Sequence, residues 1–258
     1  GHIQETDTFD TWFSSAQWPF ATLMAADKRK TSDTSDTPDT ADTFFNRFYP
    51  TDVMETAYDI LIFWIMRMLM MGIYATGEVP FRDVYLHGLV RDEKGQKMSK
   101  SKGNVINPLD VVDKFGADAL RMALVMSTTP GQDSAMGESK VKGMRNFANK
   151  VWNAARYVTF DYNDPNNMGV LSRKMASVDI DEEGRLDYEQ YADNKAQEII
   201  DNVTHLLNEY KIGLAAETVH NEFWHWFCDD LIEQNKDGYI NTELLSKIFI
   251  KLNRELFT

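Results

Sequence analysis

A strand, a glycine-bounded loop and a helix follow one another between residues 81 and 115, and this order most constrains the fold. Residues 81–90 alternate apolar and polar side chains and carry β-branched and aromatic residues, which is typical of a β-strand. A helix is expected after the loop, over residues 107–115. Because open α/β sheets bind ligands at the carboxyl ends of their strands, His87 and Gly88 lie where a ligand is expected.

The loop carries closely spaced lysines between Gly95 and Gly103. Lys97 and Lys100 can fold over a triphosphate and neutralise the charge that develops as pyrophosphate leaves. A Walker A loop would need a second glycine ahead of the lysine, and no Gly-x-Gly-x-x-Gly turn follows the strand. The position after a strand favours a nucleotide-activating loop over the alternative, a solvated Lys/Ser-rich linker.

The sequence around this loop resembles the class I aminoacyl-tRNA synthetases, and its flanks are similar to the valyl-tRNA synthetase family in particular. The matching blocks occur in the family's order across residues 7–156, at 10–20, 48–53, 58–64, 97–101, 107–110, 116–121, 131–133 and 145–154. Beyond them the match thins to residues 223–229. The resemblance implies a cytoplasmic enzyme that activates valine with ATP, supplied as its Mg²⁺ complex, and transfers valine to tRNA(Val).

The family pattern also implies roles for individual residues. Those implied for ATP binding are His87, Gly88, Lys97, Ser99 and Lys100, with Lys97 and Lys100 as the catalytic pair. Those implied for the amino-acid pocket are Trp12, Asp59 and Ile60. The alternative for Trp12 and Ile60 is an ordinary place in the core.

The resemblance further predicts a mixed, mainly α fold in two parts. Residues 1–136 are expected to be the second half of a Rossmann-type α/β catalytic domain, with a low-complexity Thr/Asp-rich insertion at 31–43. Residues 137–258 are expected to form a helical, anticodon-binding-type bundle. The family's His-Ile-Gly-His turn and editing domain are not recognised, and Gly1-His2 is typical of an expression tag. We therefore expect an inactive fragment that lacks the N-terminal half of the same enzyme; a naturally split enzyme is the alternative.

A basic helix is predicted at residues 138–161, in a chain whose net charge is −13. An acidic protein gains little nonspecific affinity for phosphate backbones, so the local distribution of charge matters more than the sum. Residues 139–158 contain no acidic side chain. The residues expected to contact tRNA are Lys142, Arg145, Lys150 and Arg156. An amphipathic helix with a solvated basic face is the alternative.

Two acidic segments suggest a different class of protein, an EF-hand-like calcium binder. Residues 179–187 and 233–241 place glycine at the sixth loop position, as calcium loops do. The twelfth position, where the loop needs a bidentate glutamate, is Gln190 in one segment and Leu244 in the other. We therefore expect acidic turns between helices and no metal site.

Other features bear on compartment and alternatives. Cys228 is the single cysteine, which excludes an intrachain disulfide, and its aromatic neighbours indicate a core position. The apolar run at 60–74 is interrupted by Arg67 and is shorter than a bilayer requires, so we expect a buried helix and no membrane partner. Two functional alternatives stay open: a non-catalytic RNA-binding or assembly module, and an isoleucyl- or leucyl-tRNA synthetase fragment. A hydrophobic pocket separates aliphatic amino acids by only about 1–3 kcal/mol per methylene.

Overall fold

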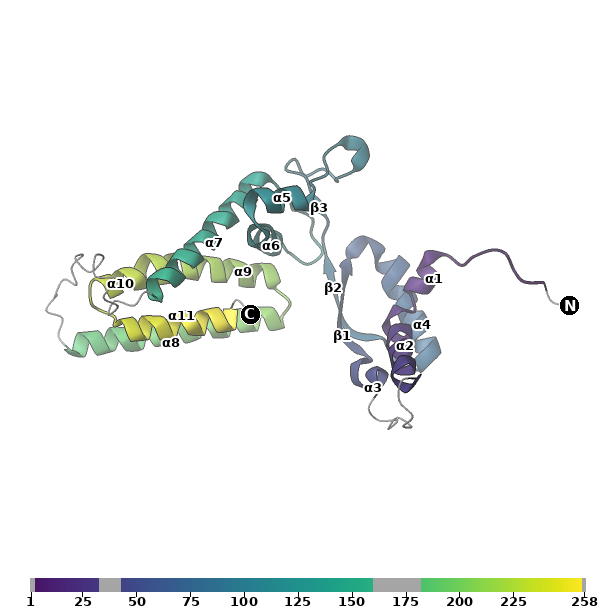
Figure 1. Cartoon of the computed structure of the whole chain (residues 1–258), viewed down its shortest axis with the longest axis horizontal. Helices are drawn as coiled ribbons and strands as arrows, with labels where there is room; N and C mark the ends of the chain where they lie inside the picture. The colour runs from purple at the N-terminus through teal and green to yellow at the C-terminus, as the bar shows by residue number, and fades with distance from the viewer. Residues whose placement is uncertain (1–2, 33–42, 160–181, 257–258) are drawn as a thin grey trace. The chain divides into compact units, whose positions relative to one another are not determined.

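The computed structural model describes residues 3–32, 43–159 and 182–256. Helices dominate this part of the chain and short parallel strands complete it, which confirms a mixed, mainly α fold (Figure 1). The chain divides into two compact units. Unit 1 comprises Gly1–Leu89 and Pro130–Asp133, and unit 2 comprises Val90–Thr129 and Ser134–Thr258. The units follow packing, so the functional division at residues 136 and 137 stays a prediction.

Unit 1 is built on a parallel pair of strands. Strands β1 (Thr51–Ala57) and β2 (Phe81–His87) pair from Thr51↔Phe81 to Ala57↔His87. Parallel neighbours require a crossover connection, and helix α4 (Met66–Thr76) lies in it. Helices α1 (Thr11–Ser15), α2 (Trp18–Ser32) and α3 (Phe44–Phe48) precede the sheet in sequence. The predicted strand at 81–90 is confirmed, although it ends at His87.

The helical segment between the strands differs from the expectation of a buried core helix. It runs from Tyr58 to Thr76, 19 residues, and is long and apolar enough to cross a membrane by length and composition alone. Only 17% of its most apolar window is buried. Ile65 and Met68 pack with Phe81, whereas the opposite side of the helix is exposed. The prediction of a short, buried helix is therefore wrong. Apolar periodicity does not tell whether the chain itself covers a helix face.

The 31–43 insertion falls mostly on residues 33–42, outside the described part of the chain. On its far side, helix α3 starts with a side-chain cap. The hydroxyl of Thr43 accepts a hydrogen bond from the Asn46 amide at 3.0 Å.

Unit 2 begins with a second, two-residue parallel pair, β3 (Val90–Arg91) with β4 (Ser134–Ala135). Between them lie the lysine loop, with the 3₁₀ turn η3 (Lys100–Lys102), and helices α5 (Pro108–Phe115) and α6 (Ala117–Val125). A small core joins α5, α6 and the first turn of the next helix; its members are Val111, Phe115, Ala119, Ala123, Met136 and Val141.

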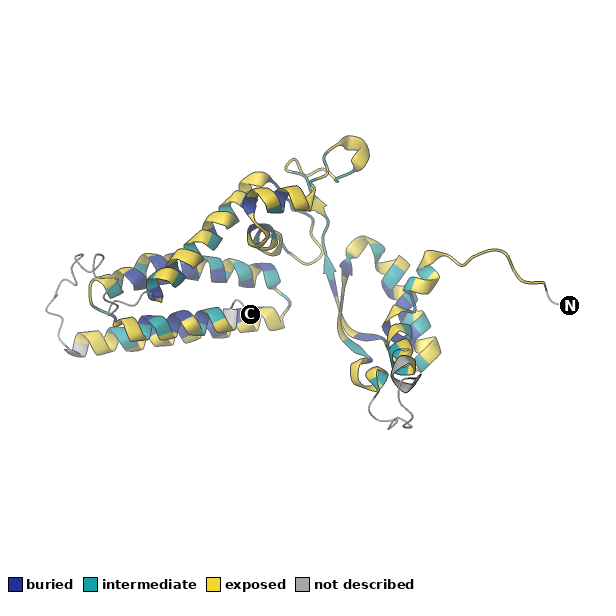
Figure 2. Cartoon of the chain, in the orientation of Figure 1, coloured by how far each residue is buried: buried dark blue, intermediate teal, exposed yellow. Residues whose placement is uncertain are grey.

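The rest of unit 2 is a helical bundle, as predicted (Figures 1 and 2). Its elements are α7 (Glu138–Val158), α8 (Glu182–Asn208), α9 (Ile212–Asn221), the π-helical η5 (Glu222–Leu231), α10 (Ile232–Lys236) and α11 (Thr242–Leu256). The largest fully buried side chains of this bundle are Phe227, Leu231, Ile240, Leu245, Ile248 and Leu252. Figure 2 colours the buried residues dark blue, and such residues occur along the helices of this bundle.

The two acidic segments have structural roles in the bundle. Helix α8 already begins at Glu182, so the predicted turn at 179–187 is wrong over its described residues. In the second segment, Asn235 accepts from the Tyr157 hydroxyl at 2.9 Å and donates to the Ile240 carbonyl at 2.8 Å. Within the described ranges, no group of three or more His, Cys, Asp or Glu residues could hold a metal ion.

Cys228 lies in the bundle core, as predicted, and is a free thiol. Burial raises the pKa of this thiol to about 11; the nearby Lys150 acts in the opposite direction. Because the thiolate is the reactive form, the folded chain should react with a thiol reagent at pH 8 far more slowly than the urea-unfolded chain. Absorbance of released thionitrobenzoate measures both rates. Equal rates would show that this part of the bundle opens freely.

Candidate functional site

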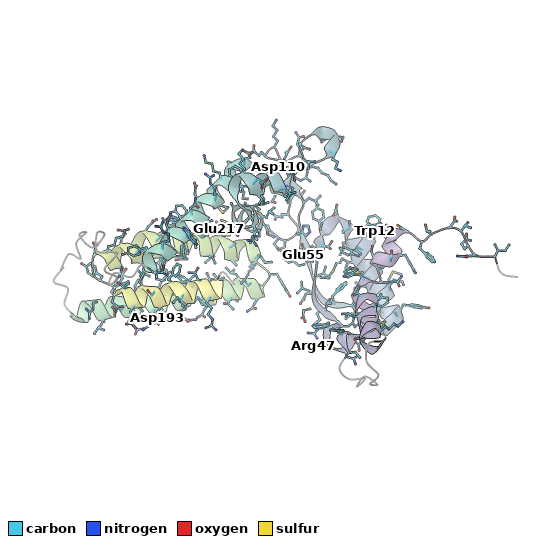
Figure 3. The ribbon with its side chains drawn as sticks, viewed as in Figure 1. Trp12, Arg47, Glu55, Asp110, Asp193 and Glu217 are labelled. Carbon is cyan, nitrogen blue, oxygen red and sulfur yellow. The ribbon has the colours of Figure 1, made fainter. Side chains whose placement is uncertain are left out.

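The carboxyl edge of the sheet in unit 1 brings His87 beside Glu55. Figure 3 labels Glu55. Ala57 pairs with His87, and residues two apart on a strand share a face, so Glu55 lies diagonally opposite the imidazole. The Nε2 atom of His87 is 3.1 Å from a Glu55 carboxylate oxygen, and its Nδ1 atom is 2.8 Å from the Gly88 carbonyl oxygen. These contacts fix the ring while leaving it partly exposed at the strand end.

Gly88 follows directly and makes room for another segment of unit 1. A Cβ atom at Gly88 would lie 1.7 Å from the carbonyl oxygen of Gln132. Residues 130–133 are held there because Gly131 donates to the Leu86 carbonyl at 2.9 Å and Asp133 accepts from the Leu89 amide at 2.8 Å. Only glycine permits this backbone approach, so Gly88 shapes the strand end.

The residues expected in the amino-acid pocket lie at two helix starts in unit 1. Trp12 is in α1, where the Asp10 side chain caps the helix by accepting from the Trp12 amide at 3.4 Å. Asp59 and Ile60 form the 3₁₀ turn η1 (Tyr58–Ile60) directly after β1, followed by the π-helical turn η2 (Leu61–Ile65). The Trp12 ring lies 6.2 Å from the ring of Phe63 in η2. Irregular helical turns of this kind frequently occur at functional sites.

In unit 2, the lysine loop is closed by the carboxylate of Asp92. One oxygen accepts from the amides of Lys94 at 3.0 Å and Gln96 at 2.7 Å, and the other accepts from the Asn104 side chain at 2.8 Å. These hydrogen bonds, Asn104 first, lower the pKa of the Asp92 carboxyl. The sequence pattern did not identify Asp92 or Asn104, although both lie beside the glycines that bound the loop.

Ser99 sits at the centre of the loop and caps its helical turn. Its amide donates to Asn104 at 2.9 Å, and its hydroxyl accepts from the Lys102 amide at 3.3 Å. Met98 packs against the small core of α5 and α6. The middle of the loop is therefore fixed by hydrogen bonds of its backbone and by the packing of one apolar side chain, Met98.

The lysines on this scaffold are exposed. Among the described residues, no carboxylate lies within ion-pair distance of Lys97, Lys100 or Lys102. Three ammonium groups on one short, anchored loop create a local positive potential that would attract a polyanion.

The same loop is tied to the start of α7. A Glu93 carboxylate oxygen accepts from the Glu138 amide at 2.9 Å, which satisfies one of the free N–H groups at the helix N-terminus. A Cβ atom at Gly137 would lie 2.1 Å from that oxygen, so glycine is needed for the contact. Neither residue was singled out by the sequence pattern.

Helix α7 divides the four expected RNA-contacting residues into two groups. Lys142, Arg145 and Arg156 are exposed, and within the described ranges none of them has an ion-pair partner. Lys150 points into the bundle, where its ammonium lies 2.6 Å from Asp229 and 4.2 Å from the centre of the Trp224 ring. The hydrogen bond from Lys150 lowers the pKa of the Asp229 carboxyl.

A family model described as tRNA synthetases class I (I, L, M and V) matches residues 2–137. Curated relatives that are similar to the chain include valine–tRNA ligases. That of Dehalococcoides mccartyi is 44% identical over 90% of this chain, and those of Clostridium acetobutylicum and Bacillus subtilis are 42% identical over 89% and 90% of it. Each alignment spans 24% of the relative, so the chain spans about a quarter of the relatives it matches.

A solved structure shows the same fold. The LeuRS of Agrobacterium radiobacter, in a ternary complex with tRNA and LeuAMS, superposes with a TM-score of 0.70 at 22% identity. The superposition covers 98% of this chain and 30% of that chain.

The close approach at Gly88 yields a test of the strand end. We expect Gly88→Ala to destabilise the chain by about 2 kcal/mol or more, because the methyl group forces the Gln132 backbone away. Gly143→Ala is the matched control: nothing lies within 4 Å of the added Cβ inside α7, so it should stabilise by about 0.5–1 kcal/mol. Urea titration of both variants measures the difference. A neutral Gly88→Ala would remove the packing argument for residues 130–133.

Proposed function

Since the chain belongs to the family of class I tRNA synthetases (I, L, M and V), we propose that it forms part of a valine–tRNA ligase. The observation that carries this proposal is the similarity to valine–tRNA ligases, at 42–44% identity over about nine-tenths of the chain. The exposed lysines of the anchored loop supply the chemistry that activation with ATP requires. Because the chain spans about a quarter of those relatives, activity of the whole protein is part of the proposal.

In the proposed reaction, a carboxylate oxygen of valine attacks the α-phosphorus of ATP. A bond forms between this oxygen and the α-phosphorus, while the bond from the α-phosphorus to the oxygen that bridges the α- and β-phosphates breaks. Pyrophosphate leaves with the electron pair of the broken bond. Lys97 and Lys100 would neutralise the charge that builds up on the leaving group, which is worth most in the transition state. Magnesium enters with ATP, where it neutralises phosphate oxygens.

The sheet edge in unit 1 is proposed to hold the rest of the substrates. His87 is fixed by Glu55, and its partly exposed ring would contact the base or ribose at the strand end; Gly88 would act by letting residues 130–133 pack there. Trp12 and Ile60, both half-buried, would wall the valine side chain, with Asp59 near its polar end. Ser99 would act mainly by holding the loop, since its hydroxyl already caps the turn.

The bundle is proposed to bind tRNA(Val) through α7. Lys142, Arg145 and Arg156 present unpaired charge on one exposed side, and counterion release would supply much of the affinity. We place the reaction in the cytoplasm; a free, buried cysteine is compatible with a reducing compartment. A non-catalytic RNA-binding module remains the second candidate, and the two candidates differ in pyrophosphate exchange.

The first test joins the chain to the missing parts of a relative. In a chimera where these residues replace the matching segment of the Bacillus subtilis ligase, we expect ATP–pyrophosphate exchange with valine and far less with isoleucine, leucine or methionine. Lys100→Ala should lower kcat by roughly 10² or more with little change in the KM for valine. Lys94→Ala is the control, since Lys94 lies in the same loop outside the lysine motif.

Exchange rates are followed with labelled pyrophosphate. A folded chimera that binds tRNA yet exchanges with none of the four amino acids would favour the RNA-binding module. Equal kcat for Lys100→Ala and Lys94→Ala would return the loop to a solvated linker.

The second test concerns α7. Replacing Lys142, Arg145 and Arg156 with Gln should make the negative slope of log K against log salt for tRNA less steep, by about one per lost phosphate contact. Lys150→Gln should leave the slope unchanged and cost about 1 kcal/mol of stability, because it breaks the Asp229 pair and the Trp224 contact. Titration at several salt concentrations and thermal melting separate these effects. A slope that changes only with Lys150→Gln would reverse the assignment.

A further inference from the structure

The side-chain amide of Asn104 uses both its donors and its acceptor inside the lysine loop. Its Nδ2 atom donates to a carboxylate oxygen of Asp92 at 2.8 Å and to the Lys97 carbonyl oxygen at 3.3 Å. Its Oδ1 atom accepts from the Ser99 amide at 2.9 Å. The opposite orientation of the amide would set its oxygen against two other oxygens, so these partners fix the orientation.

These hydrogen bonds hold the backbone between the two lysines. The Lys97 carbonyl and the Ser99 amide lie on either side of Met98, and the Asn104 amide pairs with both. The Met98 side chain packs against the small core of α5 and α6. Lys100 follows Ser99 directly in the chain. The backbone from which both lysine side chains project is therefore held, while the side chains themselves stay exposed.

Asp92 ties the Asn104 amide to the beginning of the loop. The second oxygen of its carboxylate accepts from the amides of Lys94 at 3.0 Å and Gln96 at 2.7 Å. Hydrogen bonds to an ionised carboxylate are stronger than those between neutral groups. The Asn104 amide is therefore held between a carboxylate with several partners and the backbone that carries the lysines.

Helix α5, which follows the loop, has a cap of its own. The Asn107 side chain accepts from the Leu109 amide at 3.2 Å. The start of the helix therefore does not depend on Asn104, whose hydrogen bonds all point back into the loop. This separates a role in placing the lysines from a role in forming the helix.

We propose that Asn104 is a positioning residue for the activation step, because its amide sets where Lys97 and Lys100 lie against the triphosphate. The inference rests on the proposed function and adds the group that holds the two cations in place. A misplacement of about 1 Å in an active site can lower the rate by roughly 10²-fold. Loss of the Asn104 amide should therefore lower kcat, and it should leave the binding of valine in unit 1 unchanged.

The kinetic experiment uses the chimera with the Bacillus subtilis ligase and follows valine-dependent pyrophosphate exchange. Asn104→Asp keeps the shape of the side chain but sets a carboxylate against the Asp92 carboxylate and the Lys97 carbonyl. It should lower kcat by roughly 10- to 100-fold with little change in the KM for valine. Asn107→Asp is the matched control: it makes the same change of charge at a helix cap, where aspartate is equally suitable, and should leave kcat unchanged.

A swap of the two residues tests the pairing itself. Asp92→Asn combined with Asn104→Asp restores an amide facing a carboxylate and the net charge of the unaltered chain. It should raise kcat by roughly 5-fold or more over Asn104→Asp alone. Recovery should be partial, because the Lys97 carbonyl still lacks its donor. A merely structural role for either residue would not yield this rescue.

Hydrogen exchange in the 258-residue chain tests the contact without any activity. Asn104→Ala removes the acceptor of the Ser99 amide, so exchange of that amide, followed by NMR, should become faster by roughly 5-fold or more. Amides of the bundle core, such as that of Phe227, should exchange as in the unaltered chain. Thermal melting checks that every variant is folded.

The outcomes separate this inference from the proposed function. If the unaltered chimera exchanges pyrophosphate and Asn104→Asp has the same kcat, the positioning role alone is overturned. A swap no faster than Asn104→Asp, or a Ser99 amide that exchanges equally fast in Asn104→Ala and the unaltered chain, would also overturn it. A folded, unaltered chimera without exchange would overturn the proposed function, and the positioning role with it.

Discussion

The lysine loop depends on the hydrogen bonds that the Asp92 carboxylate accepts. The carboxylate joins positions twelve residues apart through Asn104 and also closes the turn that begins the loop. Because the pKa of Asp92 is lowered, these bonds are present above the ordinary range of an aspartate and are lost as the pH falls through the lowered value. The loop is therefore held by Asp92, and the ammonium groups of Lys97 and Lys100 need no ion pair within the described part of the chain to position it.

The fold was predictable where local pattern decides it. The helices of the bundle and the strand beginning at Phe81 follow from apolar periodicity, and their ends differ by a few residues from those expected. Strand β1 was not predicted as a strand, because its pairing with β2 is made by residues about thirty positions away. Helix α4 was expected to be buried on all sides, and one side is exposed. The sequence of a helix does not show which elements pack against it.

The candidate site was predictable to a similar depth. The lysine motif identified Lys97 and Lys100, whereas Asp92 and Glu93 act through contacts that only folding creates. The basic residues of α7 were identified as a set, but Lys150 belongs to the bundle because Asp229, far along the chain, approaches that side of the helix. Trp152 lies at helical spacing between Asn149 and Arg156, and the sequence pattern did not single it out.

The cap that Glu93 places on α7 has a mechanical consequence. Helix α7 has 21 residues and is therefore a stiff rod about 30 Å long. A tilt of about 5° at the capped end displaces the other end by roughly 3 Å, given that length. Glu93 follows Asp92 directly in the chain, so a sideways displacement of the far end of α7 would act on the hydrogen bond at the base of the loop.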